Sequence, residues 1–289
     1  MTYSLENTAH CRTLVAQFDH DRYLTTLYAR QEKREGLYAI YAFNYEISRI
    51  RETVSEPMLG EIRLQWWREA IEGIYQDNIQ NHDVVLPLAT AINEFKLPRD
   101  IFMAIIDGRS QDLYDDSPEN IAALEDYLHK TAGNIACLAV LILGQKDSKE
   151  PTSELASDLP RRLGVAWGYV GIIRAIPYHL SLKKNFIPLD LMEKYGIAPR
   201  KFLSPDDLGP VKEILQELCQ QAERHLQYLS NNKKHINTDV RSVYLLSALT
   251  REYLKTIKKA DYNPFRLMEK AGSFSRQWHL LTSALFNRI

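Results

Sequence analysis

The stretch from residue 34 to residue 51 reads REGLYAIYAFNYEISRIR. Its large apolar side chains recur at intervals of three and four residues, which is the spacing of one face of an α-helix. This face carries Leu37, Ile40, Tyr41, Phe43, Ile47 and Ile50. Because so broad an apolar face must be buried against other elements, the stretch predicts one helix of a packed helical core.

Helical periodicity recurs along most of the chain, and the regular alternation of β-branched residues that indicates strands is absent. The helical periodicity of the segment from Met58 to Tyr75 predicts one apolar face that includes Ile62, Trp66, Ala70, Ile71 and Ile74. The further predicted helices are Pro98–Leu113, the segment from the turn Ser117–Asn120 to about Gly144, a helix starting at Asp158 or Pro160, Leu208–Ser230 and Thr238–Lys258. Pro177 is expected to end or kink the third of these, the helix that starts at Asp158 or Pro160. The sequence therefore predicts an all-α protein.

The chain is long enough for one large domain or two small ones, with 289 residues of which 45% are hydrophobic. Its weakest helical signal lies at 145–157, a stretch rich in Lys, Ser, Glu and Pro, where a boundary between two domains could fall. The flanking helices are too apolar to stand apart. We therefore expect a single domain that spans residues 1–289.

Composition limits the classes of partner and compartment. Lys and Arg number 36 against 37 Asp and Glu, which gives no electrostatic footprint for nucleic acid. The cysteines Cys11, Cys137 and Cys219 are far apart and show no metal-ligand spacing, which favours a reducing compartment. The longest apolar run, Ala136–Leu143, is far shorter than the roughly 20 residues of a membrane span. We expect a cytoplasmic protein.

Small residues gather in two predicted helices, at 132–136 (AGNIA) and 164–171 (GVAWGYVG). A glycine inside a helix costs about 1 kcal/mol relative to alanine. It is retained where two helices approach closely or where a ligand cavity needs room between them. The sequence leaves both interpretations open.

Several segments together resemble the squalene/phytoene synthase family. They are REGLYAIYAF at 34–43, LQWWR at 64–68, YLHKTAG at 127–133 with Gly144 after it, and the segment 164–188 that ends in Phe186-Ile-Pro188. They follow the family's order and cover about residues 20–260. The resemblance implies the isoprenoid synthase fold, which is a bundle of helices around a deep central cavity.

Active members of that family join two allylic diphosphates head to head. The resemblance implies that aspartates on two facing helices hold Mg²⁺, a hard cation that prefers oxygen ligands and stabilises the leaving diphosphate. In this sequence the first aspartate motif falls on Ser48, Arg49 and Glu52, and the second falls on Gly171, Ala175 and His179. Glu52 is the only acid among these six residues. We therefore expect no metal site, no confident catalytic residue and no cofactor, with Mg²⁺ required only if the protein is an active synthase.

Other positions match the family's ligand pocket. These pocket candidates are Tyr41, Arg49, Glu52, Asp112, Tyr127, Arg174 and Lys184. In one interpretation, Arg49, Arg174 and Lys184 bind a phosphate or diphosphate directly, without metal. In the other, Arg49 forms ion pairs with acids along its own helix, at Glu46, Glu52 or Glu56.

The segment 42–69 is similar to one branch of the family, that of the mitochondrial respiratory complex I assembly factor and its bacterial relatives. That branch also replaces the aspartate motifs. The resemblance implies a non-catalytic protein that binds an isoprenoid or another lipid, or that acts with respiratory-complex subunits. The alternatives are an active prenyltransferase, a transferase that condenses two farnesyl or geranylgeranyl diphosphates, and a purely structural interaction protein.

Two further segments have two interpretations each. The C-terminal stretch 265–289 mixes aromatic, aliphatic and basic residues, so it either lies on a membrane surface at the inner face or packs across the bundle. The acidic residues Asp107, Asp112, Asp115, Asp116 and Glu119 are irregularly spaced for a metal site, and we interpret them as a solvated helix end.

Overall fold

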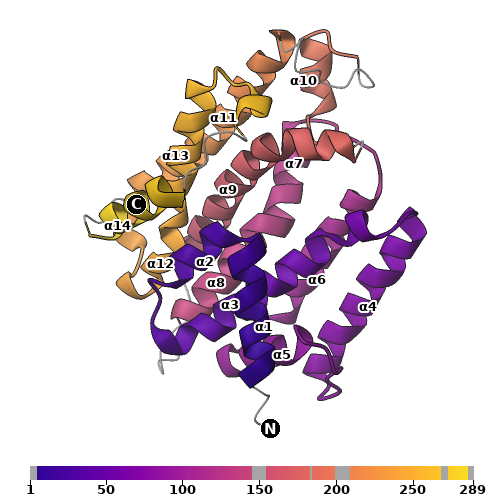
Figure 1. Ribbon diagram of the computed structural model, residues 1–289, viewed down its shortest axis with the longest axis vertical. Coiled ribbons are helices and arrows are strands. Elements are labelled where there is room, and N and C mark those ends of the chain that lie inside the picture. The colour runs from indigo at the N-terminus through magenta and orange to yellow at the C-terminus, as the bar shows by residue number, and fades with distance from the viewer. Residues whose placement is uncertain (1–4, 145–153, 183, 199–208, 268–272, 286–289) are drawn as a thin grey trace.

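Helices make up the regular structure of every segment described by the computed structural model, namely residues 5–144, 154–182, 184–198, 209–267 and 273–285 (Figure 1). The α-helices are α1 Leu5–Phe18, α2 His20–Thr26, α3 Gln31–Ser48, α4 Pro57–Tyr75, α5 Val85–Phe95, α6 Arg99–Ser110, α7 Ile121–Leu128, α8 Asn134–Gly144, α9 Glu154–Ser181, α10 Leu189–Lys194, α11 Gly209–Asn231, α12 Arg241–Tyr244, α13 Leu246–Lys259 and α14 Ser273–Leu285. The short helical turns used below are η1 Ile50–Thr53, η2 Gln111–Leu113 and the π segment η3 His129–Gly133. The predicted all-α class is confirmed.

Helix α9 is the axis of the bundle. It packs against α11 and α13 on one side and against α7, η3 and α8 on the other (Figure 1). Helix α3 forms a second centre, in contact with α1, α5 and α8. Helix α8 is therefore in contact with both α3 and α9.

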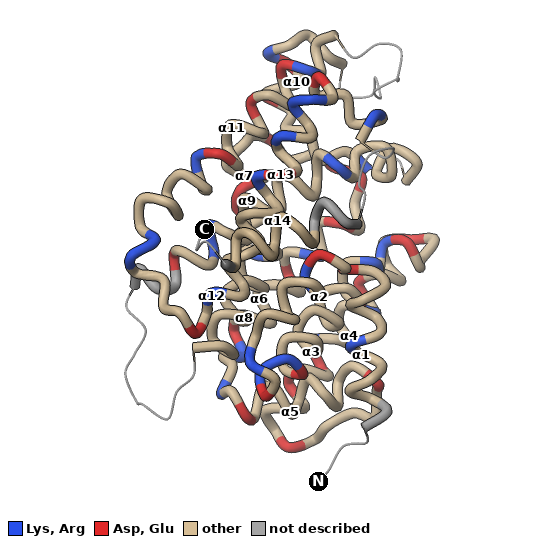
Figure 2. Tube along the Cα trace, turned by 60° about the vertical axis from the view of Figure 1, so that its left-hand side comes forward, with Lys and Arg blue, Asp and Glu red and all other residues tan. Residues whose placement is uncertain are grey.

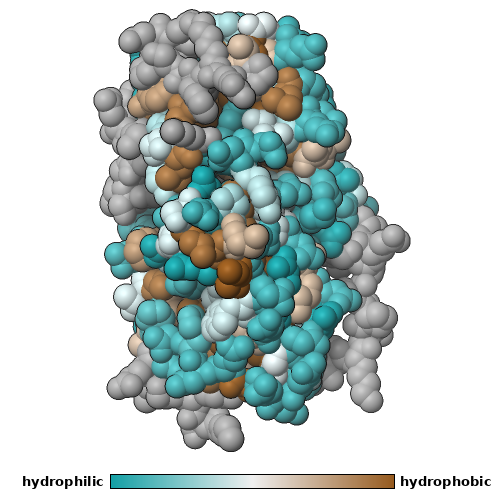
Figure 3. All heavy atoms as spheres, turned by 90° about the vertical axis from the view of Figure 1, so that its right-hand side faces the viewer, coloured by the Kyte–Doolittle hydropathy of each residue, from teal (hydrophilic) through white to brown (hydrophobic). Residues whose placement is uncertain are grey.

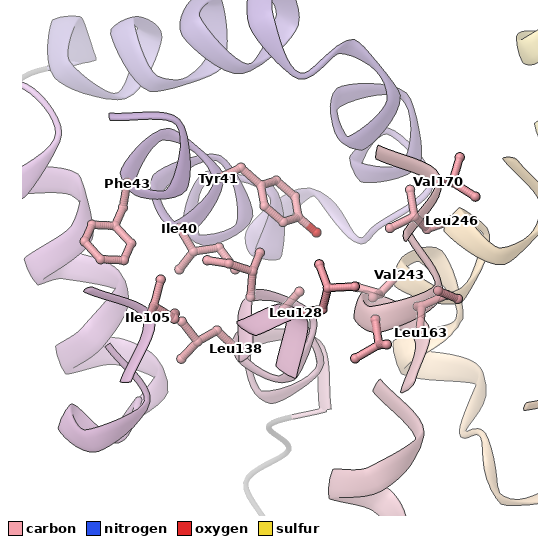
Figure 4. Packing of buried hydrophobic residues seen from close by; sticks show 14 of the residues in the cluster. Ile40, Tyr41, Phe43, Ile105, Leu128, Leu138, Leu163, Val170, Val243 and Leu246 are labelled. Atoms are coloured by element: carbon pink, nitrogen blue, oxygen red, sulfur yellow. The ribbon is translucent and has the colours of Figure 1, made fainter. Parts of the chain in front are cut away.

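Buried apolar side chains join these two centres. Ile40 and Phe43 of α3 pack with Ile105 of α6 and Leu138 of α8, and the cluster continues to Leu163 and Val170 of α9, then Val243 and Leu246 (Figure 4). All of these side chains are less than 9% exposed. Buried residues thus link helices from both sides of the weak stretch 145–157. Residues 145–153 of that stretch lie outside the described segments, and the single domain stays a prediction.

Helix α9 corrects two expected boundaries. It begins at Glu154, before Asp158 and Pro160, and it continues past Pro177 to Ser181. Proline in a helix interior removes one backbone hydrogen bond and costs about 3 kcal/mol. The buried face of α9, which includes Val165, Ala166, Tyr169 and Ile173, packs on several neighbouring helices and outweighs this local cost.

The small residues of α9 serve both of the roles that the sequence left open. A Cβ atom added at Gly164 would lie 2.2 Å from the carbonyl oxygen of Ala132, so α9 and η3 are in backbone contact there. A Cβ at Gly168 would lie 2.6 Å from Leu128 Cδ2, whereas a Cβ at Gly171 meets nothing within 4 Å. Close packing therefore explains Gly164 and Gly168, and open space begins at Gly171.

The segment Ile121–Gly144 is helical over 24 residues and is apolar enough to cross a membrane by length and composition. However, 67% of its most apolar window is buried inside the fold. Its N-terminus is capped as the sequence predicts, because the side chain of Asn120 accepts a hydrogen bond from the backbone N–H of Ala123 at 2.9 Å. The segment is a core helix of this bundle.

Basic and acidic residues are intermixed along the chain, in keeping with the net charge of −1 (Figure 2). Helix α4 lies on the face shown in Figure 3, where hydrophobic side chains gather near the middle. Its first turns expose Met58, Leu59 and Ile62, and Ile62 is 59% exposed. The expectation that Ile62 belongs to the buried face of this helix is wrong, since the buried stripe runs through Leu64, Trp67, Ala70, Ile71 and Ile74.

Candidate functional site

A cavity of about 350 Å³ lies where the carboxyl end of α3 meets the middle of α9. Its wall is formed by the end of α3 with η1, the α6–η2 junction, α7 with η3, and the second half of α9 with the segment that follows it. Its volume falls in the range of pockets for small organic ligands, about 300–1,000 Å³. The apolar part of the wall includes Leu128, Trp167, Ile172, Leu182 and Phe186.

Five of the six positions that match the aspartate motifs lie on this wall: Ser48, Glu52, Gly171, Ala175 and His179. The Ser48 hydroxyl donates to the carbonyl oxygen of Tyr45, 2.9 Å away, and is thereby engaged within its own helix. Gly171 and Ala175 carry no polar side chain. The two facing helices therefore meet across the cavity with a single carboxylate, Glu52, at these positions.

Arg49 lies outside the cavity wall. Its Nη1 donates to the hydroxyl oxygen of Tyr45 at 2.8 Å, and its guanidinium stacks over the Tyr45 ring, 5.1 Å from the centroid. Phe18 stacks on the same ring at 4.5 Å. Arg49 is thus held by Tyr45, one turn earlier on the same helix, and Phe18 of α1 stacks on that tyrosine. Neither sequence interpretation, the direct phosphate contact or the ion pair along the helix, describes this position.

The other pocket candidates divide into two groups. Asp112, Tyr127 and Lys184 line the cavity together with Glu52. Tyr41 of α3 is buried among core side chains (Figure 4). Arg174 stacks on the Tyr253 ring at 3.7 Å and lies 3.8 Å from an Asp21 oxygen. Tyr41 and Arg174 therefore do not line the cavity.

The ammonium group of Lys184 is already bound by backbone carbonyl oxygens. Its ammonium donates to the carbonyl oxygens of Gln111 at 3.0 Å and Asp116 at 3.1 Å, and also to that of Tyr114. The side chain is 5% exposed, and burial lowers its pKa. Three carbonyl partners match the three donors of an ammonium group. Lys184 thus ties the end of α9 to the η2 turn instead of offering a free charge to a ligand.

The polar centre of the wall is Arg109, which the sequence analysis missed. Its Nη1 donates to Asp112 Oδ2 at 3.0 Å and to the hydroxyl oxygen of Tyr127 at 2.8 Å, and its Nη2 donates to Asn44 Oδ1 at 3.3 Å. The spacing of three residues between Arg109 and Asp112 is an ion-pair signal that could have identified both. Asp112 is 8% exposed. The expectation that it belongs to a solvated helix end is therefore wrong for Asp112, although Asp107 and Asp115 are exposed and pair with Arg68 and Arg51 respectively.

Two more basic residues on the wall were missed. Arg22, on α2, is 7% exposed and forms an ion pair with Asp19 at 2.7 Å. Arg51, on η1, pairs with Asp115 at 3.3 Å. Arg51 lies inside the altered aspartate motif, two residues after Arg49, and the turn at η1 directs it rather than Arg49 to the cavity. Nothing in the local sequence around Arg22 distinguishes it from a surface arginine.

Acidic side chains on the wall are too dispersed for a conventional metal centre. Within the described residues, no three His, Cys, Asp or Glu side chains form a group that could hold a metal ion. Glu52 lies beside Tyr178, whose pKa rises to about 12 through burial and a hydrogen bond to Glu52. Asp112 is already paired with Arg109. The chemistry that this arrangement offers is hydrogen bonding and apolar contact.

His179 makes the stability of the wall depend on pH. Burial, together with the nearby charges of Lys184 and Arg109, lowers its pKa to about 4, and Asp112 opposes this shift. The unfolded state then binds a proton near pH 6.5, whereas the folded state does so only near pH 4. We therefore expect the free energy of unfolding to fall by about 1–3 kcal/mol from this group as the pH falls through that window.

Urea denaturation of the wild type and of His179→Gln at pH 7.5 and pH 4.5 measures this effect. The variant is expected to lose less stability between the two pH values, because glutamine does not titrate. His129 and His225 also have lowered pKa values and are present in both proteins, so they cancel in the comparison. Equal losses in the two proteins would contradict the assignment to His179.

Comparison with known proteins agrees with this geometry. The squalene/phytoene synthase family model matches residues 15–282. A human relative, NADH dehydrogenase (ubiquinone) complex I, assembly factor 6, is 30% identical over 256 residues, which cover 89% of this chain and 75% of the relative. A 15-cis-phytoene synthase from Synechocystis is 24% identical over 265 residues, covering 88% of this chain and 77% of that enzyme.

Among solved structures, a dehydrosqualene synthase in complex with ligand superposes with a TM-score of 0.84 at 18% identity, over 98% of this chain and 96% of that one. This likeness confirms the isoprenoid synthase fold that the sequence resemblance implied. The family model covers most of the chain, and a relative at 30% identity covers a similar span. The chain therefore belongs to the squalene/phytoene synthase family.

Proposed function

We propose that this protein binds an isoprenoid or another lipid-like molecule without a metal ion and acts as an assembly factor for a respiratory complex of the NADH dehydrogenase type. The observation that carries the proposal is the wall between α3 and α9, where Ser48, Gly171 and Ala175 stand at motif positions and Glu52 is the one carboxylate among them. Mg²⁺ binds through several oxygen ligands. The relatives named as complex I assembly factors support the second half of the proposal.

The cavity favours lipid binding over a purely structural role. Side chains do not fill the space between α3 and α9, since a volume of about 350 Å³ remains and much of its wall is apolar. A pocket of this size favours a bound molecule. The structural alternative would require the same space to be closed by packing, as it is at Gly164.

Incubation with farnesyl or geranylgeranyl diphosphate and Mg²⁺ tests the absence of synthase activity. We expect no diphosphate release and no condensed hydrocarbon above the level of a protein-free control. A phytoene synthase of the family, assayed in parallel, verifies the conditions. A C30 or C40 product from this protein would overturn the proposal and favour the prenyltransferase alternative.

The assembly role is tested in cells by deletion of the gene and native gel analysis of the respiratory complex. Loss of the assembled complex, restored by the wild-type gene, supports the role. A second complementation with Gly171→Trp, which places a large ring in the cavity, asks whether the bound molecule matters. An intact complex in the deletion strain would contradict the assembly role.

We also propose that the protein is peripheral to the membrane and contacts it through α14. This helix buries Leu280 and Ser283 against the bundle and exposes Trp278 and Leu281, which are 58% and 42% exposed. Exposed aromatic and aliphatic side chains on an amphipathic helix insert at the lipid interface. The predicted contact 265–289 also includes 268–272 and 286–289, which lie outside the described residues.

Vesicle flotation measures this contact. With vesicles that contain anionic lipid, the floating fraction of the double variant Trp278→Ser, Leu281→Ser is expected to be several-fold lower than that of the wild type. The double variant Met58→Ser, Ile62→Ser, altered on exposed apolar residues of α4, controls for general surface hydrophobicity. Equal flotation of all three proteins would remove α14 as the membrane contact.

A further inference from the structure

The charges on the cavity wall are already balanced by the protein. Among the described residues, the Arg and Lys side chains on the wall are Arg22, Arg51, Arg109 and Lys184. The three arginines form ion pairs with Asp19, Asp115 and Asp112 respectively, and Lys184 is held by backbone carbonyl oxygens.

A diphosphate group brings several negative charges and needs free cations or metal ions to balance them. On this wall it would have to displace existing partners, and it would lie near the carboxylates of Glu52 and Asp112. Like charges at short range in a partly buried site repel strongly. The electrostatics therefore select against a diphosphate head group and favour an uncharged one.

Unsatisfied polar atoms remain on the same wall. Asp112 is more than nine-tenths buried, and while its Oδ2 accepts from Arg109, its Oδ1 has no hydrogen-bond partner. Arg51 Nε, Arg109 Nε and His179 Nδ1 are also buried without a partner. A buried polar atom without a partner costs about 1–3 kcal/mol, so this wall gains from a ligand that supplies the missing hydrogen bonds.

These unsatisfied atoms define the complementary group. A carboxylate oxygen requires a donor, Arg109 Nε requires an acceptor, and a neutral imidazole nitrogen takes either role according to its tautomer. A hydroxyl group both donates and accepts. A hydrocarbon provides neither, and a fully ionised phosphate provides no donor for Asp112.

We propose that the cavity binds a lipid-like molecule whose head group is an uncharged hydroxyl, as in a long-chain prenyl alcohol, and that this hydroxyl donates to Asp112 Oδ1. The apolar wall formed by Leu128, Trp167 and Ile172 takes the hydrocarbon chain. The inference rests on the proposed lipid-binding function and names the class of ligand. It makes Arg109 a positioning residue, because Arg109 holds the carboxylate through the other oxygen.

Isothermal titration of the full-length protein with farnesol, farnesyl diphosphate and the hydrocarbon farnesene, without added metal, tests the inference. We expect farnesol to bind at least about tenfold more tightly than either of the others, which is the effect of one charge-assisted hydrogen bond. Tighter binding of farnesyl diphosphate would overturn the inference and leave the lipid-binding function standing. Failure of all three probes to bind would overturn both.

A second measurement assigns the hydrogen bond. Asp112→Asn is expected to weaken farnesol binding about tenfold and to leave farnesene binding unchanged. Asp107→Asn, an exposed residue of the preceding helix α6, is the matched control, and circular dichroism verifies that both variants are folded. If Asp112→Asn is folded and binds farnesol as tightly as the wild type, Asp112 is not the acceptor. The ranking of probes on the wild type does not depend on any variant.

Discussion

Gly164→Ala is expected to lower the free energy of unfolding by about 3 kcal/mol. The added methyl group would lie 2.2 Å from the carbonyl oxygen of Ala132 and 2.6 Å from the Cα atom of Gly133. Both atoms belong to backbone, so no rotamer change relieves the overlap, and α9 must move away from η3. The gain in helix propensity from glycine to alanine, about 1 kcal/mol, offsets only part of this cost.

The matched control is Gly171→Ala, two turns later on the same helix. A Cβ atom there meets nothing within 4 Å, so the helix-propensity gain should appear without a penalty. Urea or thermal denaturation of the two variants should therefore give shifts of opposite sign. Equal stability of Gly164→Ala and the wild type would show that the two helices are not in backbone contact at this point.

Arg109→Leu is expected to destabilise the protein by about 3–5 kcal/mol, the usual cost of leaving one member of a buried ion pair without its partner. Asp112 would lose its cationic partner, and the Tyr127 hydroxyl and Asn44 would each lose a donor. Since these groups join α3, α6, η2 and α7, the loss should also loosen the cavity wall. Chemical denaturation measures the first effect, and farnesol affinity measures the second.

The double variant Arg109→Leu, Asp112→Leu separates the two causes of that loss. Removing both charges leaves no unpaired ion, so the double variant should recover part of the stability lost by the single one. Farnesol affinity should not recover, because the acceptor is then absent. A double variant less stable than the sum of the single changes would contradict an ion-pair origin.

The helices were predictable where one face is continuously apolar. Residues 34–51 and 58–75 gave both position and type, because the 3.6-residue period of their buried side chains leaves no other element that could bury them. The boundaries of α9 were not predictable, because Pro160 and Pro177 indicate helix ends locally, whereas packing against helices distant in sequence keeps the helix continuous. Ile62 was misplaced for a similar reason, since its helix begins beyond the edge of the core.

The site was predictable at the positions that the family motifs fix and not at the positions that the tertiary structure supplies. Glu52, Gly171 and His179 line the cavity as their motif positions imply. Arg22 comes from a helix whose sequence carries no functional signal. Asn44 lies on α3, but the motif does not single it out, and only the fold places both residues on the wall. The positive charge of Arg49 made it a candidate for the pocket. Its side chain instead binds Tyr45, on which Phe18 stacks, and does not line the cavity.

The π segment His129–Gly133 makes this part of the chain sensitive to insertions and deletions. A π turn holds one more residue than an α turn, and one residue rotates an α-helix by about 100°. The extra residue lets Tyr127 and Thr131 line the cavity while Leu138 still faces the core. Deletion of a single residue here would restore a regular helix and rotate the apolar stripe of α8 out of the core. A gap in this segment between homologues would therefore indicate a differently shaped wall, not a neutral change in length.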